Sequence, residues 1–312
     1  MHWGAAVASL IKRLRNVAIY HAVRAFIALM NAVPRRWALT VGGWTGAVAY
    51  LAARGSRRLT RDNLTLAYGD EKSRRQIRQL GRSVFRELGR NVVDVARMPR
   101  VTAENVDDLV RADGLPYLES AYGEGRGVVA VSAHLGNFEL MGTYLALKGY
   151  AVTVVAAPLY DARLDALLMQ NRMRGGLNVV SRDRAATAVF RALKKGHVVG
   201  LLVDQDTRGT GITVPFFGWP ARTPTGPAVL AYRSDAPIVP MAIHRLPDDT
   251  HLVTVRPPIR PAGGNPEEIE KTTSEYTVEL ERFIRRAPEQ WVWLHDRWKA
   301  SRQSGEVADR PT

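Results

Sequence analysis

Apolar and polar positions in the first third of the chain follow a helical period. Within residues 16–34 the apolar positions recur at steps of four and three, while polar side chains take the other side, which predicts an amphipathic helix. An uncharged stretch from Trp37 to Ala53 predicts a second helix, in which Gly42 and Gly46 allow a close approach to a neighbouring helix. A third helical pattern, highly basic, covers residues 60–98.

After Pro99 the pattern changes to short β-branched runs that alternate with amphipathic segments of about ten residues. The predicted strands are Gly127–Ser132, Ala151–Ala157, Leu177–Ser181, Val198–Asp204, Ile238–Ile243 and Leu252–Arg256. The predicted helices are Phe138–Leu147, Arg163–Arg174, Ala185–Lys195 and Glu267–Arg286. This alternation indicates an α/β fold with a mostly parallel central sheet flanked by helices. We therefore divide the chain into an N-terminal helical region (1–98), an α/β core (99–300) and a polar tail (301–312) that we expect to be frayed.

The charge of the chain narrows the choice of partners. Lys and Arg total 44 against 30 acidic residues, a net charge of +14 that favours binding to anionic lipid, nucleic acid or an acidic protein. The absence of cysteine excludes a disulfide-stapled fold, thiolate catalysis and a metal centre with Cys ligands.

The two N-terminal helices have features of a membrane-associated hairpin. The second stretch would extend about 26 Å as a helix, short of the roughly 30 Å hydrocarbon core. Basic residues flank both stretches on each side, so neither helix has an end that favours translocation. We expect the hairpin to lie on, or dip into, the cytoplasmic leaflet. The alternative is that these helices simply pack on the core.

One segment carries candidate chemistry. The residues from His134 to Glu139 read H-L-G-N-F-E and directly follow a predicted buried strand, where open α/β sheets place their ligand sites. If the chain turns at Gly136, the Glu139 carboxylate could orient the imidazole of His134 so that its free nitrogen accepts a proton. A structural histidine is the alternative. Asp204, in D-Q-D at the end of another predicted strand, should lie beside His134.

Four motifs together resemble the lipid A biosynthesis acyltransferases, the lauroyl and myristoyl enzymes within the wider lysophospholipid acyltransferase superfamily. They are H-L-G-N-F-E at 134–139, D-Q-D at 204–206, P-F-F-G at 215–218, read as a loop, and P-E-Q-W-V-W-L-H-D-R-W-K at 288–299. The resemblance runs from about Tyr20 to Lys299, nearly the whole chain.

The resemblance implies roles for individual residues. His134 would be the general base for an acceptor hydroxyl and Glu139 its orienting partner. Asp204 matches an acidic family position near this dyad, and either Arg172 or Arg174 matches an arginine that meets the acceptor phosphate or the thioester. Other assignments have less support. The carry-over of Gln205, as a substrate-binding residue, and of Arg297 is weaker, and a packing role for either has at least as much support. Phe216 and Phe217 could line an acyl tunnel, and each could equally be a packing residue. Backbone amides near Leu135–Asn137 are candidate donors to the oxyanion.

The resemblance also implies the reaction and its setting. The enzyme would move a fatty acyl chain from a thioester, on acyl carrier protein or as acyl-CoA, to a hydroxyl of a lipid A precursor or related glycolipid, without a cofactor or metal. Its place would be the cytoplasmic face of the inner membrane, beside anionic lipid.

Other functions stay open at this point. Within the family, the acceptor could be a phosphatidylinositol mannoside and the donor acyl-CoA. A non-catalytic basic protein that binds membrane or nucleic acid would account for the charge, although the chain has no nucleic-acid module motif. A metal-dependent hydrolase is disfavoured because the seven histidines are scattered and no two are spaced i, i+4.

Overall fold

The computed structural model describes residues 2–182, 185–206 and 211–305. Its helices are α1 (His2–Ala32), α2 (Arg35–Ala52), α3 (Arg54–Tyr68), α4 (Arg74–Arg97), η1 (Met98–Arg100), α5 (Val106–Leu109), α6 (Leu115–Gly123), α7 (Phe138–Leu147), α8 (Ala162–Arg174), α9 (Ala185–Lys194), α10 (Gly226–Ser234), α11 (Pro266–Arg286), η3 (Pro288–Gln290) and α12 (Lys299–Gln303). Its strands are β1 (Val110–Asp113), β2 (Val128–Ser132), β3 (Val152–Ala156), β4 (Asn178–Ser181), β5 (Val198–Leu202), β6 (Gly211–Phe216), β7 (Trp219–Pro224), β8 (Ile238–Arg245) and β9 (His251–Val255).

The centre of the fold is a seven-stranded sheet in the order β1-β9-β8-β2-β5-β3-β4. All neighbouring strands run parallel except the antiparallel pair β8–β9. This confirms the predicted α/β class and its mostly parallel sheet. β2 lies in the middle of the sheet and is fully buried, and its carboxyl end leads into the segment with His134.

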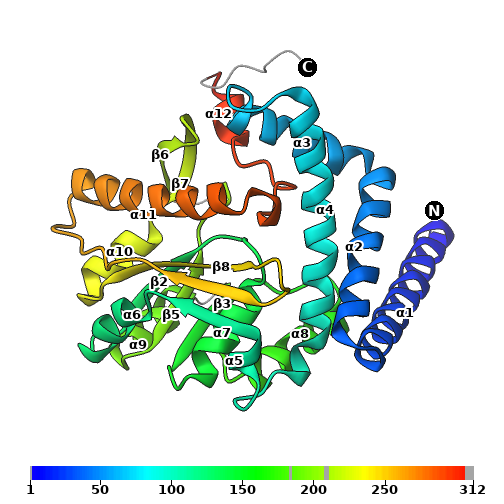
Figure 1. Ribbon diagram of the computed structural model, residues 1–312, viewed down its shortest axis with the longest axis horizontal. Helices are drawn as coiled ribbons and strands as arrows, with labels where there is room; N and C mark the ends of the chain where they lie inside the picture. The colour runs from blue at the N-terminus through cyan, green and yellow to red at the C-terminus, as the bar shows by residue number, and fades with distance from the viewer. Residues whose placement is uncertain (1, 183–184, 207–210, 306–312) are drawn as a thin grey trace.

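Helices cover both faces of the sheet (Figure 1). Successive side chains of a strand point to opposite faces. Val129 and Val131 of β2 accordingly pack into the core that contains α9, α10 and α11, whereas Val128 and Ala130 face the core that contains α6 and α7. Burial on both faces explains why these strands are continuous apolar runs in the sequence.

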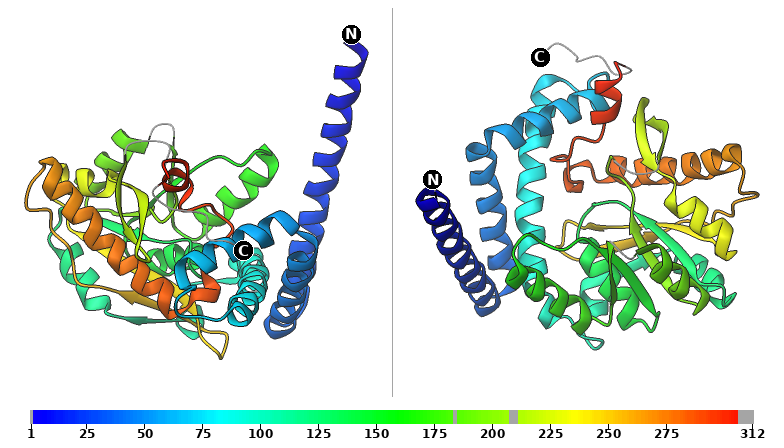
Figure 2. Two further views of the ribbon diagram at one scale, coloured as in Figure 1. Left: turned by 90° about the horizontal axis from the view of Figure 1, so that it is seen from above. Right: turned by 180° about the vertical axis from the view of Figure 1, so that it is seen from behind.

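The N-terminal helices form a layer at one side of the sheet. α2 packs along α4, and α1 also packs on α4 near its C-terminal end, while its N-terminal part extends past the body of the protein (Figures 1 and 2). The contact of α2 with α4 depends on glycine: a Cβ at Gly46 would overlap the carbonyl oxygen of Phe85, and one at Gly89 would overlap that of Gly42. The small-residue spacing therefore serves packing within the protein.

A buried polar network joins this helical layer to the sheet. Arg245 at the end of β8 is only 5% exposed and donates to Asp94 (2.6 Å) and Asn91 (2.8 Å) on α4. Asp94 also accepts from Arg35 at the start of α2 (2.9 Å). Three elements far apart in the sequence are thus held together by charge-assisted hydrogen bonds.

The structure corrects several predicted elements. The single helix predicted over residues 60–98 is two helices, because Ser73 and Gln76 form a capping box that starts α4 anew. The segment read as the P-F-F-G loop belongs to a β-hairpin of β6 and β7, whose turn residues Phe217 and Gly218 have positive φ angles of 52° and 74°.

Other elements were not predicted. The sequence pattern missed β1, α6 and α10, and the first helix begins well before residue 16. The segment predicted as a frayed tail contains part of α12, with Ser301 buried, whereas residues 306–312 lie outside the described residues.

Candidate active site

The loop that follows β2 makes a tight turn, as the position of Gly136 predicted. Gly136 has a φ of 56°, and a side chain there would overlap the carbonyl oxygen of Ile243. Its N–H donates to the carbonyl of Gln290 (3.0 Å), and its carbonyl accepts from Asn91 Nδ2 (3.0 Å). The loop is therefore fixed from two sides, by η3 and by α4.

His134 is held by Asp204, as the strand-end positions of the two residues predicted. The Nδ1 atom of His134 lies 2.8 Å from Asp204 Oδ1, and its backbone N–H donates to Oδ2 (2.9 Å). Trp291 Nε1 also donates to Oδ2 (2.6 Å), and the N–H of Val292 donates to the His134 carbonyl (3.1 Å). The carboxylate is buried, while 24% of the His134 side chain stays exposed.

This geometry determines the protonation of the dyad. With its proton on Nδ1, His134 donates to Asp204 and keeps Nε2 free as an acceptor. Burial lowers the pKa of His134, but the charge and hydrogen bond of Asp204 and the charge of Glu139 outweigh it, so this pKa is raised. Burial raises the pKa of Asp204, yet His134 and Trp291 together lower it below its usual value. Asp204 is thus ionised at neutral pH and favours a protonated imidazole.

Glu139 does not have the predicted contact. Both carboxylate oxygens of Glu139 accept hydrogen bonds from the guanidinium of Arg172 on α8, with Oε2 2.9 Å from Nε. Neither side chain of this ion pair is more than 15% exposed. The helix start at Asn137 directs Glu139 toward α8, and the buried Asp204 takes the place beside His134 that we expected for Glu139. Glu139 influences His134 only through its charge.

An apolar cavity of about 90 Å³ lies next to this ion pair, between α7 and strands β2, β3 and β5. Glu139 and Arg172 line it together with Phe138, whose ring packs edge-on against His134 at 5.2 Å. Met141, Leu145, Leu177 and Met241 are among the remaining lining residues. The buried hydroxyl of Ser132, another lining residue, has no hydrogen-bond partner among the described residues. His134 and an apolar cavity are therefore neighbours, with Phe138 between them.

The other predicted residues lie apart from this centre. Phe216 and Phe217 are buried against Trp291, Trp293 and Trp298 and do not line this cavity, so their place in an acyl tunnel stays a prediction. Arg297 is buried and bonded to the carbonyl of Arg222 and to Thr223 Oγ1, and burial lowers its pKa to about 10. It is a packing residue.

Two further residues have positions without a defined contact. Arg174 is the exposed last residue of α8, so of the two arginines only Arg172 reaches the site. Gln205 is half-buried beside Asp204 and makes no hydrogen bond within the described part of the chain.

The amides of Leu135 and Gly136 already donate to carbonyls of Ala133 and Gln290, which removes them as oxyanion donors.

Sequence reasoning missed the residues that fix the loop. Trp291 stands in a quoted motif, but nothing in the motif signals its bond to Asp204. Asn91 lies on a helix 45 positions from Gly136 and carries no local signal at all.

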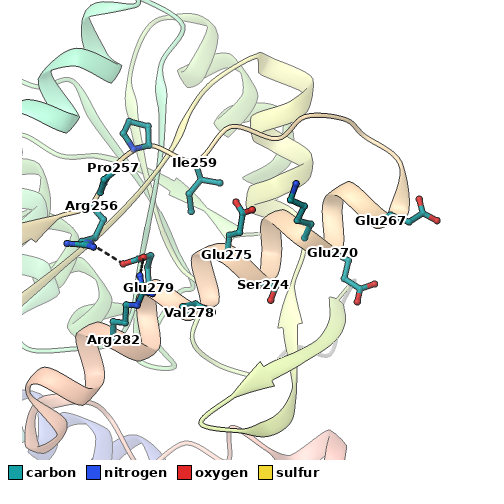
Figure 3. A pocket seen from close by; sticks show the side chains of 12 residues that line it. Arg256, Pro257, Ile259, Glu267, Glu270, Ser274, Glu275, Val278, Glu279 and Arg282 are labelled. Carbon is teal, nitrogen blue, oxygen red and sulfur yellow. Dashed lines mark hydrogen bonds and ion pairs between the residues drawn. The ribbon is translucent and has the colours of Figure 1, made fainter.

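A larger hollow lies away from the dyad. A groove of about 870 Å³ runs along α11 beside residues 256–259, and Figure 3 displays its lining. Acidic and basic side chains are mixed there, and Glu279 binds both Arg256 and Arg282. No predicted site residue lines this groove, so the candidate active site is the smaller, mostly apolar cavity near His134.

The fold and the dyad define an α/β protein with a His–Asp pair at the end of a central strand, near an apolar cavity. Residues 9–300 match the family described as bacterial lipid A biosynthesis acyltransferase. The chain belongs to this family, which confirms the resemblance and, at the level of the family, the prediction of an acyltransferase.

Individual relatives agree with this assignment. The chain is 26% identical to the lipid A biosynthesis palmitoleoyltransferase of Escherichia coli, over 85% of this chain and 86% of the relative. It is 25% identical to the lipid A biosynthesis lauroyltransferase of the same organism, over 83% and 84%. It is also 31% identical to a phosphatidylinositol mannoside acyltransferase of Mycobacterium tuberculosis, a match that spans about half the length of each protein, 49% and 50%.

Proposed function

We propose that the protein is an O-acyltransferase that moves a fatty acyl chain from a thioester to a hydroxyl of a phosphorylated glycolipid, a lipid A precursor first of all. The observation that carries this proposal is the His134–Asp204 pair beside the apolar cavity. A hydroxyl needs a base to become a nucleophile at neutral pH, and an imidazole with a free Nε2 supplies one.

The reaction needs no covalent enzyme intermediate. Nε2 of His134 takes the proton of the acceptor hydroxyl while the hydroxyl oxygen attacks the thioester carbonyl carbon. The tetrahedral oxyanion then collapses, the carbon–sulfur bond breaks, and the leaving thiolate takes the proton from the imidazolium. Asp204 stabilises the imidazolium that exists between these steps and holds the ring in one orientation.

The cavity is the proposed site of the acyl chain. Its volume of about 90 Å³ is below the roughly 300 Å³ of a usual ligand pocket, so the chain enters only when side chains repack. Met141 and Met241 line the cavity and are flexible enough to do so. The Glu139–Arg172 pair closes one wall, which gives both residues a role in shaping the acyl site in place of the role first expected for Glu139.

Acyl carrier protein is the proposed donor because α4 presents a basic stripe. Arg75, Arg78, Arg82 and Arg86 are exposed on one face of the helix, and none of the four forms an ion pair within the described residues. Two exposed arginines on other elements, Arg111 and Arg256, are by contrast paired with carboxylates. Unpaired positive charge in a row favours encounter with an acidic protein.

Membrane attachment is proposed from the outer face of α2. The glycines of α2 face α4, so the opposite face of α2 is turned outward. That outer face carries five large apolar side chains at steps of four and three, between 43% and 71% exposed: Trp37, Val41, Trp44, Val48 and Leu51. Arg36 lies beside this apolar face, and Trp is favoured at the headgroup level. No helix within the described residues has both the length and the apolar character to span a bilayer. We therefore place the protein on the cytoplasmic face of the inner membrane through this face.

The deciding experiment is a transfer assay with purified protein in detergent micelles. Labelled acyl carrier protein thioester and acyl-CoA are each offered with a lipid A precursor and with a phosphatidylinositol mannoside, the acceptor that the mycobacterial relative suggests. We expect transfer to the lipid A precursor that is lost in His134→Ala and kept in His197→Ala. His197 is the matched control because it lies at the opposite end of β5 and bonds to Thr153. Transfer that persists in His134→Ala would refute the mechanism.

A further inference from the structure

A second cavity, of about 490 Å³, lies on another side of the catalytic loop. Its walls are the end of α4, η1 and the segment that follows it, Arg35 at the start of α2, and the first turn of α7. Asn137, which caps the N-terminus of α7, and Leu140 of α7 contribute to the wall, only a few residues beyond His134. The family comparison assigns nothing to this cavity.

Three arginines converge on it. Arg35 donates to Asp94 through Nε and Nη2, Arg97 donates to carbonyls of Met30 and Val33 through Nη1, and Arg100 donates to Asn31 through Nε and Nη2. A guanidinium has five N–H donors, so each arginine retains donors that no described residue accepts. Burial lowers the pKa of Arg97, the charges of Arg100 and Arg35 lower it further, and the charge of Asp94 opposes them without restoring the usual value.

Two carboxylates line the same cavity and do not balance these charges. Asp94 is buried and is shared with Arg245 and His251 on the sheet side. Asp108 is exposed and makes no ion pair within the described residues.

Asn137 supplies an independent sign of a missing acceptor. Its Oδ1 caps α7 by accepting from the N–H of Leu140 (3.1 Å), which leaves Nδ2 as a donor. This side chain is 98% buried, and Nδ2 has no partner among the described residues. The N–H groups of Phe138 and Glu139 also lack an acceptor there, as first-turn amides do. A buried donor without a partner costs free energy, and a helix N-terminus favours an anion.

We propose that this cavity binds a phosphate group, held by Arg35, Arg97, Arg100 and the amide of Asn137, and that the phosphate belongs to the headgroup of the acceptor glycolipid. The assignment of the phosphate to the acceptor rests on the proposed function. Because Asn137 and His134 lie on one rigid loop, a phosphate bound here fixes where the acceptor presents its hydroxyl to His134.

The site can be tested without the reaction. Inorganic phosphate is titrated into the full-length protein in detergent at constant ionic strength, and binding is followed by thermal stabilisation against a chloride control. We expect Asn137→Asp to weaken phosphate binding at least tenfold, because it keeps the capping oxygen but replaces the donor with a negative charge. Asn137→Ser keeps a capping oxygen without the charge and verifies that the loop still folds.

The kinetic arm compares the acceptor with its enzymatically dephosphorylated form. We expect Arg100→Gln to raise KM for the phosphorylated acceptor about tenfold, the loss of one charge-assisted hydrogen bond, with KM for the donor unchanged. With the dephosphorylated acceptor, Arg100→Gln and the native protein should have equal KM values.

Each outcome separates the two ideas. Phosphate binding that is equal in native protein and Asn137→Asp would refute the site even if transfer proceeds. Phosphate binding together with an equal effect of Arg100→Gln on both acceptors would refute the acceptor assignment and leave a site for free phosphate. Variant-sensitive phosphate binding without transfer to any acceptor would support the site and refute the proposed function.

Discussion

Replacing Asp204 by Asn tests the dyad most sharply, because it changes the proton on His134 with little change in shape. Asp204 Oδ2 accepts two N–H groups, from the His134 backbone and from Trp291, whereas Oδ1 faces the ring alone. An Asn side chain satisfies the two donors with its oxygen and turns its NH₂ toward Nδ1. His134 must then carry its proton on Nε2 and cannot accept another there.

The magnitude follows from this change of tautomer. The same replacement in the serine protease triad lowers kcat by about 10⁴, or roughly 5.5 kcal/mol of activation free energy. The reverse orientation of the amide would leave two buried donors facing an NH₂ group, at a free-energy cost of about 1–3 kcal/mol each. This orientation is therefore disfavoured. We expect Asp204→Asn to lose at least about 10³ in kcat with KM for both substrates nearly unchanged.

The assay is steady-state acyl transfer across pH 5–9, with unfolding by denaturant as a check on the fold. Native activity should rise with pH through an apparent pKa above the ordinary histidine value, because neutral His134 is the active form and its pKa is raised. Asp204→Asn removes the negative charge that raises the pKa of His134. Burial, which lowers this pKa, should then shift the rise of activity to lower pH. Asp206→Asn is the matched control, since Asp206 bonds to the N–H of Ala300 instead. Activity of Asp204→Asn above a tenth of native, or an unchanged acidic limb, would refute the dyad.

The pair should also add a pH dependence to stability. The pKa of Asp204 is depressed, so its contribution is present above the ordinary carboxyl pKa and is lost as pH falls through the depressed value. The pKa of His134 is raised, so its contribution is present below the ordinary histidine pKa and is lost as pH rises through the raised value. Between these limits the free energy of unfolding of Asp204→Asn should fall below that of the native protein.

Three further predictions concern the helical layer. Gly46→Ala should lower the free energy of unfolding by about 1–3 kcal/mol, because its Cβ would overlap the carbonyl of Phe85, whereas Gly55→Ala, with open space around its Cβ, should raise it by up to about 1 kcal/mol. Equal denaturation midpoints for these two variants would contradict the close packing of α2. Trp44→Ala should reduce sedimentation with anionic lipid vesicles several-fold while activity on micellar substrate is kept; undiminished binding would place the membrane contact elsewhere. Arg82→Glu should raise KM for acyl carrier protein thioester several-fold and leave KM for acyl-CoA unchanged, and a rise for both donors would argue against carrier docking on α4.

Local pattern was enough for the fold class and for the positions of both residues of the dyad. A buried β-branched run followed by H-L-G-N-F-E placed His134 at a strand end, and the D-Q-D motif at the end of another strand placed Asp204 beside it. Both predictions depend only on strand periodicity and on the rule that parallel strands end at one edge of the sheet.

Contacts between distant segments were decided by the tertiary structure alone. Glu139 is five residues from His134, yet the start of α7 at Asn137 turns it toward Arg172, 33 positions away. The Phe216–Phe217 pair entered the tryptophan core because the hairpin of β6 and β7 folds against α11.

The chain by itself therefore determined which residue types stand at strand ends and which helix faces are apolar, because these follow from backbone geometry over a few residues. The partner of each polar group was decided only by packing. Asn91, Gln290 and Trp291 fix the His134 loop and its partner Asp204 from two remote segments. A buried polar group must find a hydrogen-bond partner, but the residues next to it in the sequence do not specify which partner it finds.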